Sequence, residues 1–196
     1  GRRLSVGKTK IKKTHNKPIP TAIVPIKALN LFARLPAEAD AVAQVKITGN
    51  QMLLKVGREL LSTNLVEGHF PKYQDVIPSD CDREVVLDTQ EFLSALKRAS
   101  LLTNEESKGV RLSFHDGGLT LSSRAPEQGE ATISLPIGYK GDAMDIGFNP
   151  VFLTDMLRAV HTEEITFAMK EANRPGLVRV GKEFIHVVMP VNLSSA

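Results

Sequence analysis

The stretch that decides the fold is Glu84-Val-Val-Leu-Asp-Thr-Gln-Glu-Phe-Leu-Ser-Ala-Leu-Lys-Arg-Ala99. Its β-branched opening residues predict a strand. Asp88 then predicts the start of a helix, because its carboxylate can accept hydrogen bonds from free N–H groups of the first turn, and Glu91 follows three residues later. The apolar residues of this helix recur at helical spacing and share one face: Phe92, Ala95, Leu96 and Ala99. A strand followed by a one-sided helix predicts a sheet with helices on one face.

The same pattern continues toward the C-terminus. Asn149-Pro150 predicts a second helix start, since proline at the first helical position loses no hydrogen bond there. The predicted buried stripe of that helix is Phe152, Leu153, Met156, Leu157 and Val160. Alternating apolar residues predict strands over 110–114, 119–122, 131–135, 144–148, 165–169, 177–180 and 184–189. Together these elements predict an α+β unit.

A shorter unit lies upstream. Apolar residues at helical spacing predict an amphipathic helix over 26–35, which Pro36 ends. Alternating segments bounded by glycines predict strands over 42–48, 52–56 and 60–66. The proline-rich stretch Phe70–Asp80 predicts a linker. We interpret the chain as a degenerate structural repeat cut within its first copy, with one unit and its linker over 1–79 and a second unit over 80–196.

Composition restricts the class of protein. The 196 residues are 42% hydrophobic, which suffices for a core without disulfides or metals, and the single cysteine fits a reducing cytoplasm. No apolar run approaches the roughly 20 residues that span a bilayer, so we expect no membrane association. Residues 1–17 carry seven Lys and Arg and no acid, yet we favour a solvated loop over a phosphate site for Lys8–Lys17, because no aromatic residue is interleaved. The chain begins at Gly1 without an initiator Met, so we read it as a fragment or a processed product.

Motifs for catalysis are not found in the sequence. The five histidines (His15, His69, His115, His161 and His186) lack metal-ligand spacing and are expected on the surface or partly buried. No phosphate-binding loop, nucleophile elbow or dinucleotide fingerprint occurs, so we expect no cofactor, no metal and no enzyme activity. An enzyme using His115, Asp116 or His161 stays open only if these residues converge in a cleft.

Several segments resemble bacterial DNA sliding clamps, the β subunit of the replicative polymerase. They are Gly1-Arg-Arg-Leu4, Leu65–Pro78, Leu102–Glu105, Gly109–Leu112, Ile146–Asn149 and Val187–Leu193. The resemblance covers essentially the whole chain. It implies a DNA-clamp fold, with the second half of domain two and the interdomain linker over 1–79, and a complete domain three over 80–196. It further implies a head-to-tail dimeric ring of repeated domains, with antiparallel sheets outside and helices lining a DNA-sized pore.

The resemblance also implies site residues. A cleft for partner peptides would use Gly1, Arg2, Arg3, Leu4, Pro71, Val76, Asn149, Phe152, Asn173, Pro175, Val187, Met189, Pro190, Val191, Asn192 and Leu193. Residues facing DNA would be Lys27, Arg34, Lys97, Arg98 and Arg158, for which ordinary helix solubilisation is the alternative. Leu101 and Leu102 would belong to the subunit interface. The sequence departs from the family pattern at Arg2, Ser107, Asn192 and the extension Ser194–Ala196, which bears on partner affinity.

The implied function is that of a cytoplasmic processivity factor. Its expected partners are double-stranded DNA without sequence preference, the replicative polymerase, the clamp loader, other proteins with a clamp-binding motif, and a second copy of the full-length chain. Tethering a polymerase to a ring raises its effective concentration at the primer without chemistry by the ring. The alternative is a peptide-binding or small-molecule-binding α+β module unrelated to replication. Binding of clamp-motif peptides distinguishes the two.

Overall fold

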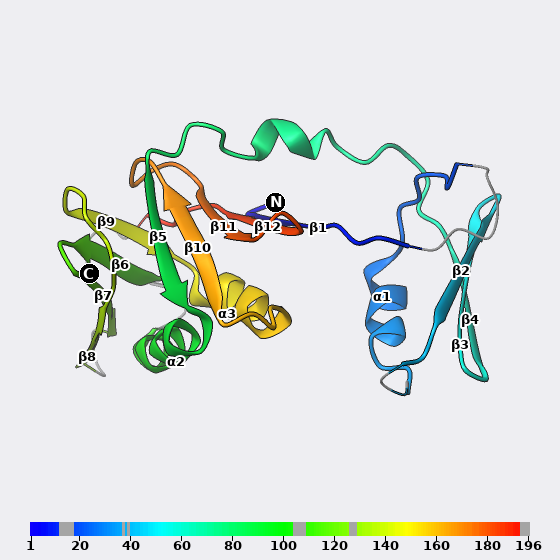
Figure 1. The fold of residues 1–196 in the computed structure, drawn as a ribbon, viewed down its shortest axis with the longest axis horizontal. Coiled ribbons are helices and arrows are strands. Elements are labelled where there is room, and N and C mark those ends of the chain that lie inside the picture. Colours follow the sequence, from blue (N-terminus) through cyan, green and yellow to red (C-terminus); the bar gives the residue numbers. More distant parts are fainter. Residues whose placement is uncertain (12–17, 37, 39, 104–108, 126–128, 193–196) are drawn as a thin grey trace. The chain divides into compact units, whose positions relative to one another are not determined.

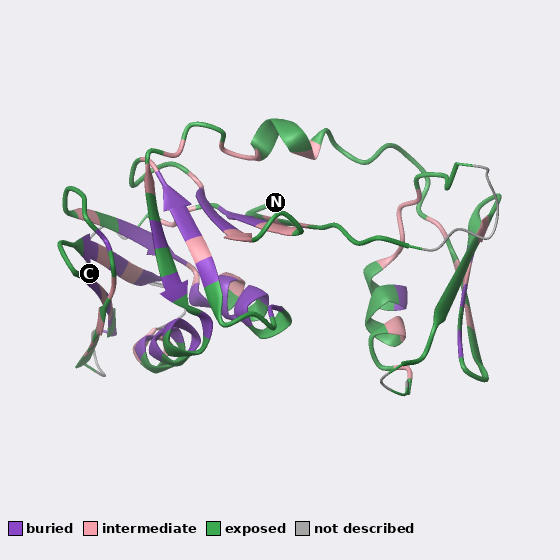
Figure 2. Cartoon of the chain, in the orientation of Figure 1, coloured by how far each residue is buried: buried purple, intermediate pink, exposed green. Residues whose placement is uncertain are grey.

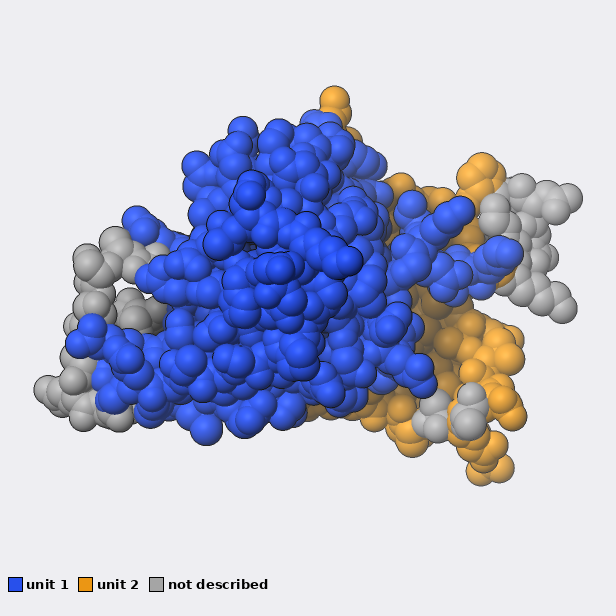
Figure 3. Space-filling view, turned by 60° about the vertical axis from the view of Figure 1, so that its left-hand side comes forward, with its two compact units in different colours: residues 1–10, 73–196 blue, residues 11–72 orange. Residues whose placement is uncertain are grey.

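The computed structural model describes residues 1–11, 18–36, 38, 40–103, 109–125 and 129–192 (Figure 1). By packing, the chain divides into two compact units, coloured separately in Figure 3. One comprises Gly1–Lys10 and Tyr73–Ala196, and the other comprises Ile11–Lys72. The first ten residues therefore pack with the larger, C-terminal unit. Our boundaries of 1–79 and 80–196 for the two clamp domains remain a prediction.

The smaller unit has one helix and one sheet. Its elements are α1 (Ile26–Phe32), β2 (Ala43–Thr48), β3 (Gln51–Val56) and β4 (Glu59–Asn64), and the antiparallel strands lie in the order β2-β3-β4. Gly49 and Gly57 make the two hairpin turns at φ values of 56° and 57°, a backbone region that glycine enters without steric cost. The three predicted strands are thus present, with no end shifted by more than two residues.

The predicted helix over 26–35 was too long, because α1 ends at Phe32. The N–H groups of Arg34 and Leu35 instead bond to carbonyls three residues back, at 3.1 and 3.2 Å. A proline disfavours the helical conformation at the residue before it, so Pro36 acts on Leu35 and the chain leaves the helix early. Arg34 consequently lies in the turn beyond α1 and not on the helix as predicted.

The larger unit contains two sheets and two main helices. Its elements are β1 (Arg3–Gly7), the 3-10 turn η1 (Tyr73–Val76), β5 (Arg83–Asp88), α2 (Thr89–Ala99), the 3-10 turn η2 (Ser100–Leu102), β6 (Val110–His115), β7 (Gly118–Ala125), β8 (Gly129–Pro136), β9 (Met144–Phe148), α3 (Pro150–Ala159), β10 (Glu164–Met169), β11 (Gly176–Val180) and β12 (Phe184–Val188). The strands form a five-stranded sheet in the order β1-β12-β11-β10-β5 and a four-stranded sheet in the order β8-β7-β6-β9. All neighbouring strands are antiparallel.

Both predicted helix starts are confirmed by side-chain caps. A carboxylate oxygen of Asp88 accepts hydrogen bonds from the N–H groups of Gln90 and Glu91 at 2.9 and 2.8 Å. The side-chain oxygen of Asn149 accepts one from the Val151 N–H at 3.0 Å. These bonds satisfy N–H groups that the helix itself leaves without partners.

The core of the larger unit lies between its sheets and the paired helices α2 and α3 (Figure 2). The predicted stripe of α2 is fully buried, at 0% exposure for Phe92, Ala95, Leu96 and Ala99. Phe167 of β10 joins the two sheets, because its ring centroid lies 5.8 Å from that of Phe114 and 5.9 Å from that of Phe148. The α+β prediction with helices on one sheet face is confirmed. In the described parts of the chain, no helix has the length and apolar character needed to cross a membrane.

Candidate functional site

β1 joins the five-stranded sheet at its edge, next to β12. The sequence patterns did not predict this strand. It runs antiparallel to β12 and places Leu4 opposite Val187. One further backbone bond, from the Met189 N–H to the Arg2 carbonyl at 2.9 Å, continues the ladder past the end of β12. Since side chains alternate along a strand, consecutive residues of β1 face opposite sides of the sheet.

One side of the five-stranded sheet carries an apolar cluster separate from the main core. Its buried centre is Ala168, Leu177 and Val187, and the partly buried residues packed against it are Leu4, Ile77, Cys81 and Ile185. We name this side the linker face, because Ile77 and Cys81 come from the segment before β5. The burial of Cys81 among apolar residues raises the pKa of its thiol, so that side chain contributes as a small apolar group.

Two apolar side chains beside the linker face are open to solvent. Met189 is 39% exposed and directly follows β12, and alternation places it on the same side as Val187. Val76 is 55% exposed and ends η1, one residue before Ile77. An exposed, flexible thioether next to a buried apolar cluster can gain contacts with an apolar side chain of a partner.

The opposite side of β1 is polar and contacts α3. Arg3 donates from a guanidinium nitrogen to a carboxylate oxygen of Asp155 at 2.9 Å, and its guanidinium carbon lies 4.7 Å from the centre of the Phe152 ring. On the same side, Ser5 shares a hydrogen bond of 2.8 Å with His186 of β12. β1 is therefore held by apolar contacts on one side and by polar contacts on the other.

A cavity of about 480 Å³ lies at the C-terminal segment. Its lining consists of Arg111, Asp145, Gly147, Ala172, Asn173, Pro190, Val191 and Asn192. Arg111 and Asp145 form an ion pair of 3.1 Å in this lining. The Val191 N–H donates to the Gly147 carbonyl at 2.8 Å, which attaches the C-terminal segment to the free edge of β9.

The structure divides the predicted docking residues into groups. Leu4 and Val187 lie together on the linker face, whereas Arg3 and Phe152 contact each other on the opposite side. Met189 directly follows β12, and Val76 directly precedes Ile77 in the chain. Four others line the cavity: Asn173, Pro190, Val191 and Asn192.

The remaining predicted docking residues lie elsewhere. Asn149 caps α3, Pro175 is half-buried before β11, and Gly1 and Arg2 are exposed ahead of β1. Pro71 belongs to the smaller unit, and Leu193 lies outside the described residues. Their roles in docking stay predictions.

His186 departs from the expectation of a surface or partly buried histidine, because it is only 2% exposed. Among the described residues its Nε2 atom has no hydrogen-bond partner. Burial, and secondarily the charge of Arg3, lowers the pKa of His186 to about 4, so its ring is neutral at pH 7. The alternation of Phe184, His186 and Val188 along one strand was the signal that could have located it in the core.

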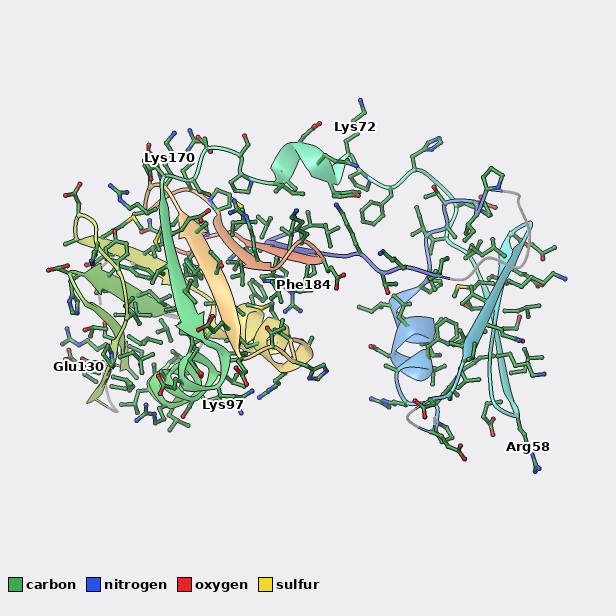
Figure 4. All side chains as sticks on the ribbon, in the orientation of Figure 1. Arg58, Lys72, Lys97, Glu130, Lys170 and Phe184 are labelled. Atoms are coloured by element: carbon green, nitrogen blue, oxygen red, sulfur yellow. The ribbon has the colours of Figure 1, made fainter. Side chains whose placement is uncertain are left out.

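The cationic residues predicted to face DNA occupy both units. Lys97 and Arg98 are exposed on the last turn of α2, and Arg158 is exposed on α3, which packs against α2 (Lys97 is labelled in Figure 4). Lys27 is exposed on α1 of the smaller unit. The three cations of the larger unit thus share one helical layer. Contact with DNA stays a prediction.

The residues predicted for a subunit interface lie in η2, immediately after α2. Leu101 is 76% exposed, while Leu102 is half-buried. An exposed leucine at the end of a helix fits a contact surface, and it also fits the ordinary exposure of single leucines. Ser107 and the extension Ser194–Ala196 lie outside the described residues.

The residues considered for catalysis lie at the end of β6 and between α3 and β10. His115 ends β6 and is exposed, with its Nε2 atom 3.3 Å from the Thr120 hydroxyl, and His161 is exposed between α3 and β10. None of His115, Asp116 and His161 lines the cavity. Over the described ranges, no three His, Cys, Asp or Glu side chains are grouped as metal ligands would be. This cavity therefore lends no support to an enzyme that uses these three residues.

Family models and similar proteins all indicate one family. The family model for the C-terminal domain of the DNA polymerase III beta chain matches residues 74–192, and the model for its central domain matches residues 1–72. The Beta sliding clamp of Pseudomonas aeruginosa is 34% identical over 173 residues, covering 87% of this chain and 47% of that protein. That of Chlamydia muridarum is 32% identical over 171 residues, covering 87% of this chain and 46% of the relative. The chain thus spans about half the length of these relatives.

Solved structures agree with the sequence matches. The DNA polymerase III subunit beta of Pseudomonas aeruginosa has a TM-score of 0.86 and 31% identity, covering 98% of this chain and 53% of that one. A putative DNA polymerase III beta subunit from Eubacterium rectale has a TM-score of 0.88 and 27% identity, covering 100% of this chain and 53% of that one. The predicted clamp fold is confirmed, and this chain belongs to the DNA polymerase III beta subunit family, the bacterial beta sliding clamps.

Proposed function

We propose that this chain is part of a processivity factor that encircles DNA as a head-to-tail dimeric ring and docks replication proteins through short apolar peptide segments. Both family models support the assignment, because together they match nearly the whole chain. The ring performs no chemistry. A polymerase docked on a ring that surrounds DNA stays near the primer, so its effective concentration there is high. The clamp loader and repair proteins with a similar motif would use the same docking site.

The observation that most supports the docking function is the exposed side chain of Met189 at the edge of the linker face. Buried Val187 and half-buried Leu4 provide an apolar wall, and Met189 lies next to it at 39% exposure. A Leu or Phe side chain of an extended peptide could bury itself there without unfolding any part of the chain. The cavity lined by Asn173 and Asn192 would contact more polar residues of the same peptide.

A solved relative supports the capacity of such clamps to hold a ligand. The sliding clamp of Bartonella birtlesii, solved bound to griselimycin, has a TM-score of 0.83 and 28% identity over 97% of this chain and 52% of its own length. We infer that this chain retains a ligand-binding surface of the same kind, and we assign it to the linker face.

The DNA-binding part of the proposal rests on charge. Lys97 and Arg98 on α2 and Arg158 on α3 are long, exposed cations on one helical layer, and phosphate contacts from such side chains carry no base preference. Encirclement predicts that the full-length protein leaves linear DNA but remains on circular DNA at salt concentrations that abolish ordinary phosphate binding.

Methyl NMR on this chain tests the docking site. Addition of a Gln-Leu-x-Leu-Phe type peptide should shift the methyl signals of Leu4, Val187 and Met189, because these groups would contact the anchor side chains. The methyl signals of Leu121, buried at 0% exposure on β7 of the four-stranded sheet, serve as the internal control. Shifts confined to other residues, or none at saturating peptide, would reject the linker face as the docking site and favour the unrelated binding module.

A further inference from the structure

We propose that Asp155 is a positioning residue for the docking site. By holding Arg3 on the α3 side of β1, it fixes the register in which Leu4 faces the linker face. The inference rests on the proposed docking function and adds to it a residue that does not itself contact the linker face.

The guanidinium of Arg3 contacts two residues of α3. Its guanidinium donates to Asp155 at 2.9 Å and lies 4.7 Å from the centre of the Phe152 ring. Phe152 and Asp155 are three residues apart, so they lie on the same side of α3. Arg158, a further turn along, approaches the other carboxylate oxygen of Asp155 at 4.0 Å. Asp155 therefore holds Arg3 while Phe152 supports the flat face of the guanidinium.

The register of β1 depends on few contacts. Arg3 is opposite Val188 and Leu4 is opposite Val187, in a strand of five residues at the sheet edge. A slip of one residue would exchange the two sides of the strand. Leu4 would then turn toward α3, and Arg3 would meet the apolar linker face without its carboxylate partner, which is unfavourable for a charged group.

Apolar packing specifies this register only in part. The apolar residues of β1 on the linker-face side are Leu4 and Val6, and both are only half-buried. The polar contacts on the other side are those of Arg3 with α3 and of Ser5 with His186. Arg3 and Ser5 flank Leu4 directly, so the contact of Arg3 with Asp155 holds Leu4 from one side and the contact of Ser5 with His186 holds it from the other.

The expected effect is on binding rather than on folding. The side chains of Arg3 and Asp155 are 42% and 43% exposed, so solvent screens the pair and its loss should leave the unfolding midpoint nearly unchanged. Loosening of β1 should weaken binding of a Gln-Leu-x-Leu-Phe type peptide by about fivefold. It should also speed the amide hydrogen exchange of β1 while the exchange of α2 stays the same.

The test compares four variants by peptide anisotropy and hydrogen exchange. Asp155→Asn should weaken binding, and Asp155→Glu should retain most of it. Arg3→Glu combined with Asp155→Arg should recover part of the binding lost in Asp155→Asn, because the ion pair is kept with its charges reversed while the contact of Arg3 with Phe152 is lost. Glu130→Gln is the matched control: it breaks an exposed ion pair, Arg124 with Glu130 at 3.4 Å, on β7 and β8 away from β1 (Glu130 is labelled in Figure 4).

The outcomes separate this inference from the proposed function. If the wild-type chain does not bind the peptide, the docking proposal fails. If the wild-type chain binds and Asp155→Asn binds equally well, the positioning role is wrong. If Asp155→Asn does not fold, the double variant Arg3→Glu with Asp155→Arg decides the question. Peptide binding by the double variant supports the inference, and a folded double variant that does not bind the peptide overturns it.

Discussion

The Oγ atom of Ser5 and the Nδ1 atom of His186 lie 2.8 Å apart and share a hydrogen bond between neighbouring strands. Ser5 is on β1 and His186 is on β12, opposite each other in the register. A protonated imidazole would carry its charge into a site that is 2% exposed, close to the positive charge of Arg3. Burial, and secondarily Arg3, therefore makes the folded state depend on a neutral ring at this position.

This dependence predicts a loss of stability in mild acid. The pKa of His186 falls from 6.5 to about 4 on folding, so between these values the unfolded chain takes up a proton that the folded chain does not. The free energy of unfolding should decrease by roughly 2 kcal/mol from pH 7 to pH 5. Urea unfolding at the two pH values measures this difference, and His186→Gln should remove most of it.

His161→Gln is the control for that measurement, because His161 is exposed. Its pH dependence should match that of the wild-type chain. A wild-type chain that is equally stable at pH 7 and pH 5 would show that His186 is solvated or protonated in the folded state.

Truncation of Leu96, in the last turn of α2, and of Leu101, in η2, should change the stability of the chain by different amounts. Leu96 is 0% exposed, so Leu96→Ala should lower the free energy of unfolding by about 2–5 kcal/mol through lost burial and the cavity left behind. Leu101 is 76% exposed, so Leu101→Ala should change it by less than about 0.5 kcal/mol. Thermal unfolding compares the two variants. A large loss of stability for Leu101→Ala at every protein concentration would place that side chain in a packed environment.

The cap of α2 gives a further prediction. The side chain of Asp88 accepts hydrogen bonds from two N–H groups of the first turn. Asp88→Ala should therefore destabilise the chain by about 1 kcal/mol, and Asp88→Asn by less, since asparagine also caps helices. Chemical unfolding of the two variants measures both effects. Equal losses for the two substitutions would indicate that the negative charge, and not the cap, is what stabilises the helix.

Most of the larger unit could be predicted from the sequence because its patterns are strong. Asp88 and the stripe from Phe92 to Ala99 specified α2, and Asn149-Pro150 specified the start of α3. Alternation located the strands to within a few residues. These features are local, so neighbouring residues in the sequence suffice to identify them.

The parts that were missed depend on distant contacts. β1 has only Leu4 and Val6 as apolar residues, and it is a strand because β12 offers a free edge far along the chain, with 181 positions separating Ser5 from His186. The ion pair of Arg3 with Asp155 spans 152 positions. No local pattern reports such pairs. The resemblance named Arg3 and Leu4 together, but only the fold shows that they face opposite sides of one strand.

Met189→Ala should weaken peptide binding by about 1 kcal/mol or more, because the substitution removes the flexible thioether beside Val187 that would contact the peptide. The stability of the chain should change little, since Met189 is 39% exposed. Lys55→Ala, an exposed residue of β3 in the smaller unit, should leave binding unchanged. Isothermal titration of the three proteins checks this. If Met189→Ala and the wild-type chain bind the peptide with equal affinity, Met189 is not part of the docking site.

The most direct measurement is a fluorescence anisotropy titration of the wild-type chain with a labelled Gln-Leu-x-Leu-Phe type peptide. A short flexible peptide loses conformational freedom and buries little area, so we expect saturable binding with a Kd on the order of micromolar. An unlabelled copy should displace it, and a copy with both leucines and the phenylalanine replaced by alanine should not. Absence of saturable binding at hundreds of micromolar, by a chain shown to be folded by circular dichroism, would contradict the docking function proposed for the linker face.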